Sequence, residues 1–337
     1  MKATHYALGL ALLFSSVSYS AEVDSFTGRY SKVSDSLPLI NERTNNYLEL
    51  SVRLANDRLP SIKQNGKKFR TCQAPKATGN FYKTMRDFFT NQYLGELAKF
   101  IVKSDKIERI KTSFVDSIYQ DFTTREAPVQ GFYARYIFDP TATVVRMGDY
   151  IVGSDKFEHF MGSGFRYFKN FYLSKKGLES ALRIGYKAET GLLGRKTTGV
   201  MAWGDLAANF NGMRFWNHVL QQNDDLIGEN LGPYVECVNH RWQLVKKINW
   251  SNYIDAAFDE GMNCSYFPNQ IMLDKVLSRI EILQKADTQK RRYHCPVDPA
   301  KIKEARSRYG HYSKYLINPG AHGVYNKEQI RSGSYWD

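Results

Sequence analysis

Apolar side chains recur at three- and four-residue steps through most of the chain after residue 20, and this helical periodicity constrains the fold most strongly. It is clear from Phe81 to Val102. Asp105 followed by Glu108 has the spacing of a capping box for a further helix, running to about Phe122. Other helices are expected at residues 155–172, 178–191, 203–220, 233–247, 251–260, 269–285 and 298–308. The sequence therefore predicts a mainly α fold.

Three segments depart from this pattern. Residues 141–153 are rich in β-branched side chains on both sides of Gly148-Asp149, which predicts one small β-hairpin. Residues 48–54 alternate apolar and polar side chains and fit a short strand at least as well as a helix. Residues 60–79 hold two prolines, two glycines and a basic stretch, and are interpreted as a connector.

No boundary divides the chain into independent domains. Four regions are distinguished by their composition: residues 1–20, a helical region at 21–150, a helical core with a polar cluster at 151–222, and a helical extension with an irregular tail at 223–337. No internal repeat is found.

The amino terminus has the three parts of a secretory signal peptide: Lys2, the apolar stretch Tyr6 to Phe14, and small residues that predict cleavage after Ser20. An exported protein, periplasmic or secreted, is expected. The absence of an apolar run of about 18 residues or more excludes a polytopic membrane protein.

Export determines how the cysteines are interpreted. Because the compartments outside the cytoplasm are oxidising, the four cysteines predict two disulfides. The cysteines are Cys72, Cys237, Cys264 and Cys295. Three pairings are open, and the lack of a CxxC pair argues against a structural zinc site.

The chain is basic, with a formal net charge of +13, and loss of Lys2 with the signal peptide leaves +12. A basic protein attracts anionic partners. Outside the cytoplasm these are cell-envelope polymers such as peptidoglycan and the headgroups of a membrane surface, so a nucleic acid is not expected.

Polar residues concentrate between Gly153 and Phe215. Asp155 and His159 are four residues apart and share one face of a predicted helix that Ser154 would cap. Gly162, on the same face, would leave a groove beside the histidine. The simpler interpretation is that Asp155 is only a helix-capping residue and His159 a hydrogen-bonded core histidine.

Glu189 lies in the last turn of the next helix, where the helix dipole and burial would raise its pKa and suit it to donate a proton. A solvated helix-end glutamate is the alternative. The loop that follows carries Arg195, Thr197 and Thr198, whose cation and hydroxyls could bind an anionic or hydroxyl-rich ligand.

The helix after this loop begins at Trp203 and carries Asp205 and Asn209, again four residues apart. Its small residues Ala208 and Gly212 would let a neighbouring helix pack closely.

The order and spacing of these residues resemble the VanZ-like superfamily, in particular its periplasmic YfiM-type lipoproteins. The resemblance is confined to residues 153–215 and runs through Asp155, Lys156, His159, Phe160, Glu189, Trp203, Asp205, Leu206, Asn209 and Gly212. It implies a compact helical bundle whose polar side chains face one another, and an association with the cell envelope. The chain lacks the apolar spans and the lipoprotein cysteine of that family, so a freely soluble exported protein is implied.

A weaker similarity concerns the reaction. A helix-terminal glutamate followed by two loop threonines, here Glu189 with Thr197 and Thr198, is similar to the lysozyme-like muramidases. That similarity implies Glu189 as general acid, with Asp205 or Asp155 as the second carboxylate that glycoside hydrolysis needs.

Three hypotheses follow. The first is an exported glycan hydrolase that acts on peptidoglycan without a cofactor and binds its substrate through Trp203, Asn209 and the loop 194–200. The second is a non-catalytic envelope protein whose buried polar network specifies helix packing. The third is a hydrolase of envelope lipid or phosphate groups that uses a divalent metal, with Lys156 and Arg195 binding phosphate. Its candidate metal ligands are Asp155, His159, Glu189 and Asp205.

Overall fold

The computed structural model describes residues 22–90, 95–129, 142–191 and 194–326. Within them the chain is mainly helical, as the periodicity predicted. The α-helices are α2 (Leu37–Asp57), α3 (Ala77–Phe89), α4 (Glu96–Lys103), α6 (Asp155–Glu158), α7 (Gly164–Phe168), α8 (Leu178–Glu189), α9 (Trp203–Leu220), α10 (Gln270–Ala286), α11 (Pro299–Tyr309) and α12 (Ser313–Leu316). None of the described helices is long and apolar enough to span a bilayer.

The strands form small two-stranded sheets. Three are antiparallel hairpins and one is a parallel pair. The strands are β1 (Ser61–Gln64) with β2 (Lys67–Arg70), β3 (Val144–Met147) with β4 (Tyr150–Gly153), β5 (Val235–Val238) with β6 (Arg241–Leu244), and β7 (Tyr266–Phe267) with β8 (Gly323–Val324). The β3–β4 hairpin turns at Gly148-Asp149, as predicted, and Gly148 has a φ of +60°.

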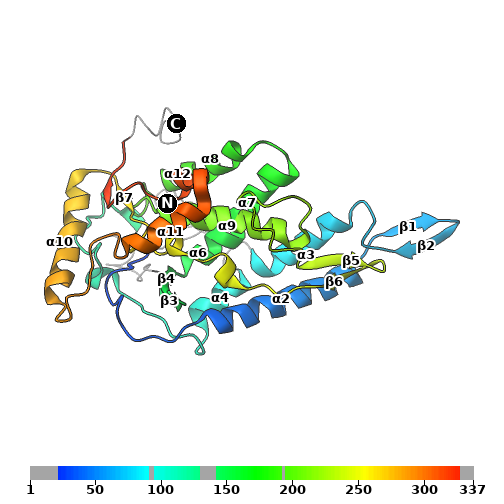
Figure 1. Cartoon of the computed structure of the whole chain (residues 1–337), viewed down its shortest axis with the longest axis horizontal. Helices are drawn as coiled ribbons and strands as arrows, with labels where there is room; N and C mark the ends of the chain where they lie inside the picture. The colour runs from blue at the N-terminus through cyan, green and yellow to red at the C-terminus, as the bar shows by residue number, and fades with distance from the viewer. Residues whose placement is uncertain (1–21, 91–94, 130–141, 192–193, 327–337) are drawn as a thin grey trace, which may run out of the picture.

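Helix α9 lies in the middle of the molecule, and α6, α7, α8 and α12 pack against it (Figure 1). Every residue from Trp203 to Val219 is buried, although several are polar or charged. A helix covered on all sides must place its polar groups against partners inside the protein, because no side faces water. Both polar clusters described below are built on this helix.

Glycines bring the neighbouring helices unusually close to α9. A Cβ at Gly212 would lie 1.9 Å from the carbonyl oxygen of Phe160, and one at Gly164 would lie 2.6 Å from the Cα of Gly212. On α8, a Cβ at Gly185 would lie 2.7 Å from Nδ2 of Asn209. The predicted close packing at Gly212 is thus confirmed, and it carries the polar residues of three helices into one place.

The segment between α6 and α8 is interrupted by two π-helical turns, His159–Ser163 and Lys169–Leu173. A single helix was predicted over this region. Such turns insert an extra residue and are frequent at functional sites. The first begins at His159, one of the predicted site residues.

One hydrophobic core is formed by buried residues that range along the sequence from Ile40 to Tyr325. A second core is formed around α10. The two predicted disulfides are present, as Cys72–Cys237 and Cys264–Cys295. The second closes the carboxyl-terminal part beside α10, as expected of a disulfide-stapled extension. Both bonds are consistent with an oxidising, extracytoplasmic compartment.

The helix predicted after Asp105 is wrong. Within this segment the structure has only a 3₁₀ turn at Phe114–Asp116. Ile110 instead exchanges backbone hydrogen bonds with Val144, and Glu108 accepts a hydrogen bond from the backbone of Ser34. Long-range pairing therefore takes the groups that a local helix would have used.

The helix predicted at residues 233–247 is also wrong, because the β5–β6 hairpin lies there. Asn239 and His240 both have positive φ values, 49° and 66°, which is the geometry of a tight hairpin turn. The connector predicted at 60–79 likewise contains the β1–β2 hairpin. Its Asn65-Gly66 turn, with φ values of 51° and 76°, is a sequence signal for that structure.

Other predicted elements differ less from the observed ones. Residues 48–54 lie within α2, which settles their ambiguity in favour of helix. The helix expected from Phe81 to Val102 is two helices, α3 and α4. The helix expected at 251–260 is replaced by two 3₁₀ turns, because Asn249 and Asp255 each hydrogen-bond the backbone two residues ahead.

Candidate functional site

Polar side chains from several separate segments meet beside the first half of α9. We call this group the acidic cluster. Its members are Glu22, Asp155, Lys156, His159, Glu189, Asp205, Asn209 and Glu260. The predicted residues of α6, α8 and α9 are therefore brought together, and Glu22 and Glu260 are added to them.

Lys156 lies at the centre of the cluster. Its Nζ is 2.7 Å from Oδ2 of Asp155, 2.6 Å from Oδ1 of Asp205 and 2.5 Å from Oε1 of Glu260. The lysine is 1% exposed. Although burial opposes the charge, Asp155 and Asp205 hold the pKa of Lys156 well above its ordinary value. The ammonium group thus orients carboxylates rather than facing a ligand in solution, the role predicted for it.

His159 is held from both sides. Its Nδ1 is 3.1 Å from Oδ1 of Asn209, and its Nε2 is 3.4 Å from Oδ2 of Asp205. Since the amide oxygen of Asn209 only accepts hydrogen bonds, Nδ1 carries the proton in this pair. Nε2 then faces the Asp205 carboxylate, an arrangement that is favourable with a cation or a proton between them.

Asp155 completes this arrangement. A carboxylate oxygen of Asp155, a ring nitrogen of His159 and a carboxylate oxygen of Asp205 all lie within 4.8 Å of one another. These are residues that can hold a metal ion. Glu189, the fourth ligand considered from the sequence, instead shares a hydrogen bond with Asp205.

Glu189 is 1% exposed at the end of α8, and its Oε1 has no hydrogen-bond partner in the described part of the chain. Burial first, and then repulsion by Asp205 and Glu22, raise its pKa well above the ordinary value. The neighbouring Asp205 behaves in the opposite way, because His159 and Lys156 outweigh the effect of burial and lower its pKa. Protonated Glu189 therefore donates to ionised Asp205.

The two remaining glutamates are also buried. Glu22 is 3% exposed, and burial together with Asp205 raises its pKa to about 7. Burial raises the pKa of Glu260 well above its ordinary value, despite the contact with Lys156, and its Oε2 has no partner among the described residues. Glu22 is the second residue after the predicted cleavage point and lies in no sequence motif.

The charges of the cluster do not balance. Five carboxyl groups, those of Glu22, Asp155, Glu189, Asp205 and Glu260, face one lysine and one histidine. Buried charges are normally paired or bind metals, and unpaired buried carboxyls take up protons. The raised pKa values of Glu22, Glu189 and Glu260 show that protons make up the difference, and a divalent cation bound beside Asp205 could replace some of them.

The cluster reaches solvent along one stripe of the segment that begins with α6. Asp155, Glu158, His159 and Gly162 are all partly exposed, and the side chains of Asp155 and His159 are 14% and 13% exposed. Outside its own helix, no atom of the described residues lies within 4 Å of the position that a Cβ at Gly162 would occupy. Burial and the charge of Asp155 raise the pKa of Glu158 to about 8.

The other predicted binding residues make contacts within the protein. Thr198 Oγ1 is 2.7 Å from Oε1 of Glu22, and Thr197 Oγ1 is 3.1 Å from the carbonyl oxygen of Gly194. The guanidinium of Arg195 lies over the ring of Tyr325, and Trp203, 1% exposed, packs edge-on against Tyr266. Thr198 therefore positions a cluster carboxyl.

A second group of polar residues surrounds the other half of α9, and we call it the Arg214 network. Its members are Asn211, Arg214, His218, Asp225, Glu229, Asp255, Arg308 and Tyr309. Arg214, fully buried, donates to both oxygens of Asp225 at 3.1 and 2.9 Å, to Asn211 at 2.6 Å and to Glu229 at 2.8 Å. Asp225 also lies 2.6 Å from Nε2 of His218.

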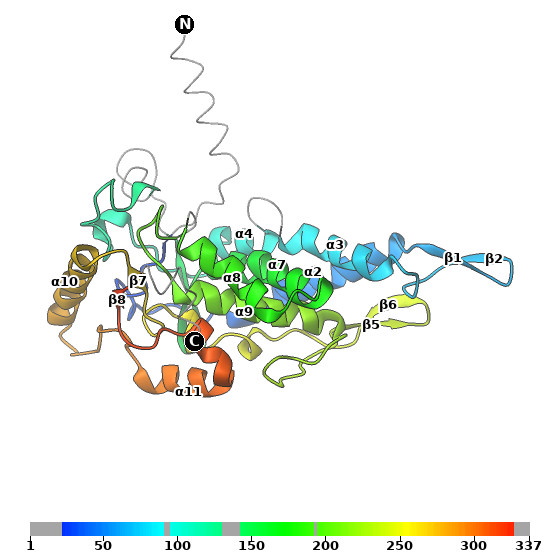
Figure 2. The same ribbon diagram turned by 90° about the horizontal axis from the view of Figure 1, so that it is seen from above.

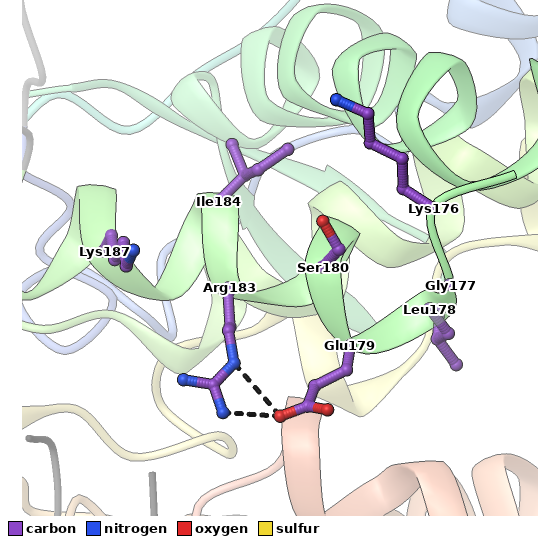
Figure 3. A pocket seen from close by; sticks show the side chains of 8 residues that line it. All are labelled: Lys176, Gly177, Leu178, Glu179, Ser180, Arg183, Ile184 and Lys187. Carbon is purple, nitrogen blue, oxygen red and sulfur yellow. Dashed lines mark hydrogen bonds and ion pairs between the residues drawn. The ribbon is translucent and has the colours of Figure 1, made fainter. Parts of the chain in front are cut away.

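A hollow on the surface lies over α8 and the residues before it, and Figure 3 shows the side chains that line it. Lys176, Arg183 and Lys187 contribute cations, and Arg183 is paired with Glu179 at 2.5 Å. None of its lining residues belongs to the acidic cluster.

Comparisons with protein-family models, curated proteins and solved structures found no match. Function is therefore inferred from the geometry of the acidic cluster.

Proposed function

We propose that this protein is an exported hydrolase that uses one divalent metal ion, held by Asp155, His159 and Asp205, and acts on an anionic component of the cell envelope. The observation that carries the proposal is the convergence of three ligand atoms, from α6, the following π-helical turn and α9, within 4.8 Å. Ligands about 2.1 Å from a common ion lie up to about 4 Å apart, so small side-chain rotations would close the set.

The surroundings of the ligands support this proposal. A histidine that binds a metal usually donates its other ring N–H to a fixed acceptor, and Asn209 provides that acceptor for His159. Lys156 and Glu189 hydrogen-bond Asp205 and fix its orientation. Oε1 of Glu189 and Oε2 of Glu260 have no hydrogen-bond partner among the described residues, and both side chains are 1% to 2% exposed, so a cation bound beside Asp205 would help these carboxyls to ionise.

The donor set also bears on the kind of ion. One imidazole and two carboxylates suit zinc or manganese better than calcium, which prefers oxygen ligands alone. Three protein ligands leave further positions open, as catalytic sites do. When bound, the ion would supply a hydroxide near neutral pH. The chain's own contribution is to hold the ligands, to exclude water on the side of Lys156, and to admit substrate beside Gly162.

The same geometry disfavours a glycan hydrolase with Glu189 as acid and Asp205 as partner. Such enzymes hold their two carboxyls about 5 to 9.5 Å apart, so that a sugar and water fit between them. Glu189 and Asp205 share a hydrogen bond and are 1% and 3% exposed. We therefore favour the metal-dependent reaction.

Metal content tests the proposal directly. Protein purified without chelator is expected to contain about one zinc or manganese ion per chain. His159→Gln and Asp205→Asn should lose it, whereas His311→Gln, at an exposed histidine outside the cluster, should keep it. Addition of the ion to chelated protein should raise Tm by several degrees in the wild type and the His311 variant only.

Activity is measured on the same samples with cell-wall sacculi and with phosphodiester and phosphomonoester model substrates. Loss of activity on chelation and recovery with the ion are expected. If the wild type holds no ion, and neither zinc nor manganese moves its Tm, the proposed function is wrong.

A further inference from the structure

The β1–β2 hairpin projects from the body of the protein at the end opposite α10, as both views show (Figures 1 and 2). It is strongly basic. Lys63, Lys67, Lys68 and Arg70 all lie within ten residues, no acidic residue occurs between Leu59 and Cys72, and all four cations are exposed.

The strand register places three of these cations on one face. Ser61 pairs with Arg70 and Lys63 pairs with Lys68, and directly opposed residues of an antiparallel pair share a face. Lys63, Lys68 and Arg70 are therefore neighbours. The other face carries Ile62 opposite Phe69, which contributes the apolar contacts of the hairpin.

The opposition of Lys63 and Lys68 destabilises the hairpin. Like charges directly across a two-stranded sheet repel each other, and neither lysine has an acidic partner among the described residues. A pair of this kind does not serve the stability of the fold. Binding of an anion between the two ammonium groups would turn the repulsion into attraction.

The base of the hairpin is fixed rather than loose. The backbone of Cys72 donates to the carbonyl of His240 at 3.1 Å, the ring of Phe69 contacts that of His240, and the Cys72–Cys237 disulfide joins the two hairpins. A tight Asn65-Gly66 turn closes the tip. The cations are thus held in place before any partner arrives, which reduces the entropic cost of binding.

We propose that the β1–β2 hairpin is a docking arm for a linear polyanion that carries phosphate groups along its length. A membrane surface fits less well. The apolar side chains of the hairpin, Ile62 and Phe69, are partly buried, so no exposed apolar residue is available to enter a bilayer. Strands of four residues, about 13 Å long, match the width of one polymer chain rather than a flat surface.

This inference is independent of the metal site, and its test is done on chelated protein. The probe is labelled long-chain inorganic polyphosphate, and binding is followed by fluorescence polarisation at low salt. Replacing Lys63, Lys67 and Lys68 by glutamine should weaken binding at least about tenfold. In 1 M NaCl, where the Debye length is about 3 Å, binding should be lost.

The matched control replaces three exposed lysines elsewhere, Lys83, Lys290 and Lys303, by glutamine. It removes the same charge and should leave binding within about twofold. The hairpin variant should have an equal or higher Tm, because the opposed lysines repel each other.

Equal weakening in the control would overturn the proposal, because net charge alone would then account for binding. Hairpin-dependent binding to phosphatidylglycerol vesicles without binding to polyphosphate would overturn it in favour of a membrane surface. Binding to neither probe would also overturn it.

Discussion

The two halves of α9 carry two buried polar groups of opposite character. In the Arg214 network, the buried carboxylate of Asp225 is paired with Arg214 and His218. Burial alone would raise the pKa of Asp225, but these two partners outweigh it and lower the pKa. Around Asp205, five carboxyls share one lysine and one histidine, and the pKa values of Glu22, Glu189 and Glu260 are raised. The same helix therefore contains one charge-paired network and one in which the carboxyl groups outnumber the cationic side chains.

This difference separates a structural role from a functional one. A polar network that specifies helix packing is expected to be paired throughout, because each unpaired buried group destabilises the fold. The Arg214 network meets this condition closely. The acidic cluster does not. Both groups reach solvent at one edge, the acidic cluster through Asp155 and His159 and the Arg214 network through Glu229 and Arg308, so charge balance is what distinguishes them.

The largest expected effect on stability is that of a substitution in the Arg214 network. Arg214→Met leaves Asp225 buried without its arginine and should lower the free energy of unfolding by about 3–5 kcal/mol, measured by urea denaturation. His159→Gln, the matched change in the acidic cluster, should cost about 1 kcal/mol, since it removes one hydrogen bond at a partly exposed side chain. Similar losses at both ends would contradict the comparison.

The next largest effect is the change of folding stability with pH that the acidic cluster causes. The pKa of Glu22 is raised from 4.5 in the unfolded chain to about 7 in the folded protein. Its contribution to stability is complete below pH 4.5 and is lost as the pH rises through 7, by up to about 3 kcal/mol. Chelated wild-type protein should therefore lose stability over this range.

Glu22→Gln, which cannot titrate, provides the control for this prediction. Its stability should change less between pH 4.5 and pH 7.5 than that of the wild type, measured by denaturation of chelated protein at each pH. Equal slopes for the two proteins would show that Glu22 does not take up a proton on folding.

The smallest expected effect is that of Glu189→Gln on stability. Because the raised pKa keeps Glu189 protonated, glutamine replaces one neutral side chain by another of nearly the same shape, and its amide can still donate to Asp205. The free energy of unfolding should change by less than about 0.5 kcal/mol. A loss of several degrees in Tm with unchanged metal content would assign Glu189 a structural role instead.

The extent to which the sequence predicted the structure varied with the range of the interactions involved. The bounds of α9 were predicted at 203–220 and agree with the structure, because the backbone hydrogen bonds of a helix join residues only four apart and need no distant partner. The segment after Asp105 was predicted wrongly, because its backbone pairs with Val144, far away in the sequence. Residues 233–247 contain helical spacing, but positive φ values at Asn239 and His240 turn the chain into a hairpin.

The candidate site shows the same dependence. Asp155, His159 and Asp205 were found because each lies in a local pattern on a helix. Glu22 and Glu260 join them only through the tertiary fold, so no spacing in the sequence could reveal that five carboxyls converge. The role of Lys156 was likewise predicted as phosphate binding, whereas the fold surrounds it with three carboxylates.

If the predicted signal peptide is removed, the buried position of Glu22 would link that cleavage to the composition of the site. Glu22 is two residues beyond the predicted cleavage point, its side chain accepts a hydrogen bond from Thr198, and its carbonyl accepts one from Ala142. Cleavage after Ser20 keeps this carboxyl, whereas cleavage two residues later would remove it. The signal peptidase would then decide how many acids the cluster contains, and a secreted population with ragged amino termini would be a mixture of different sites.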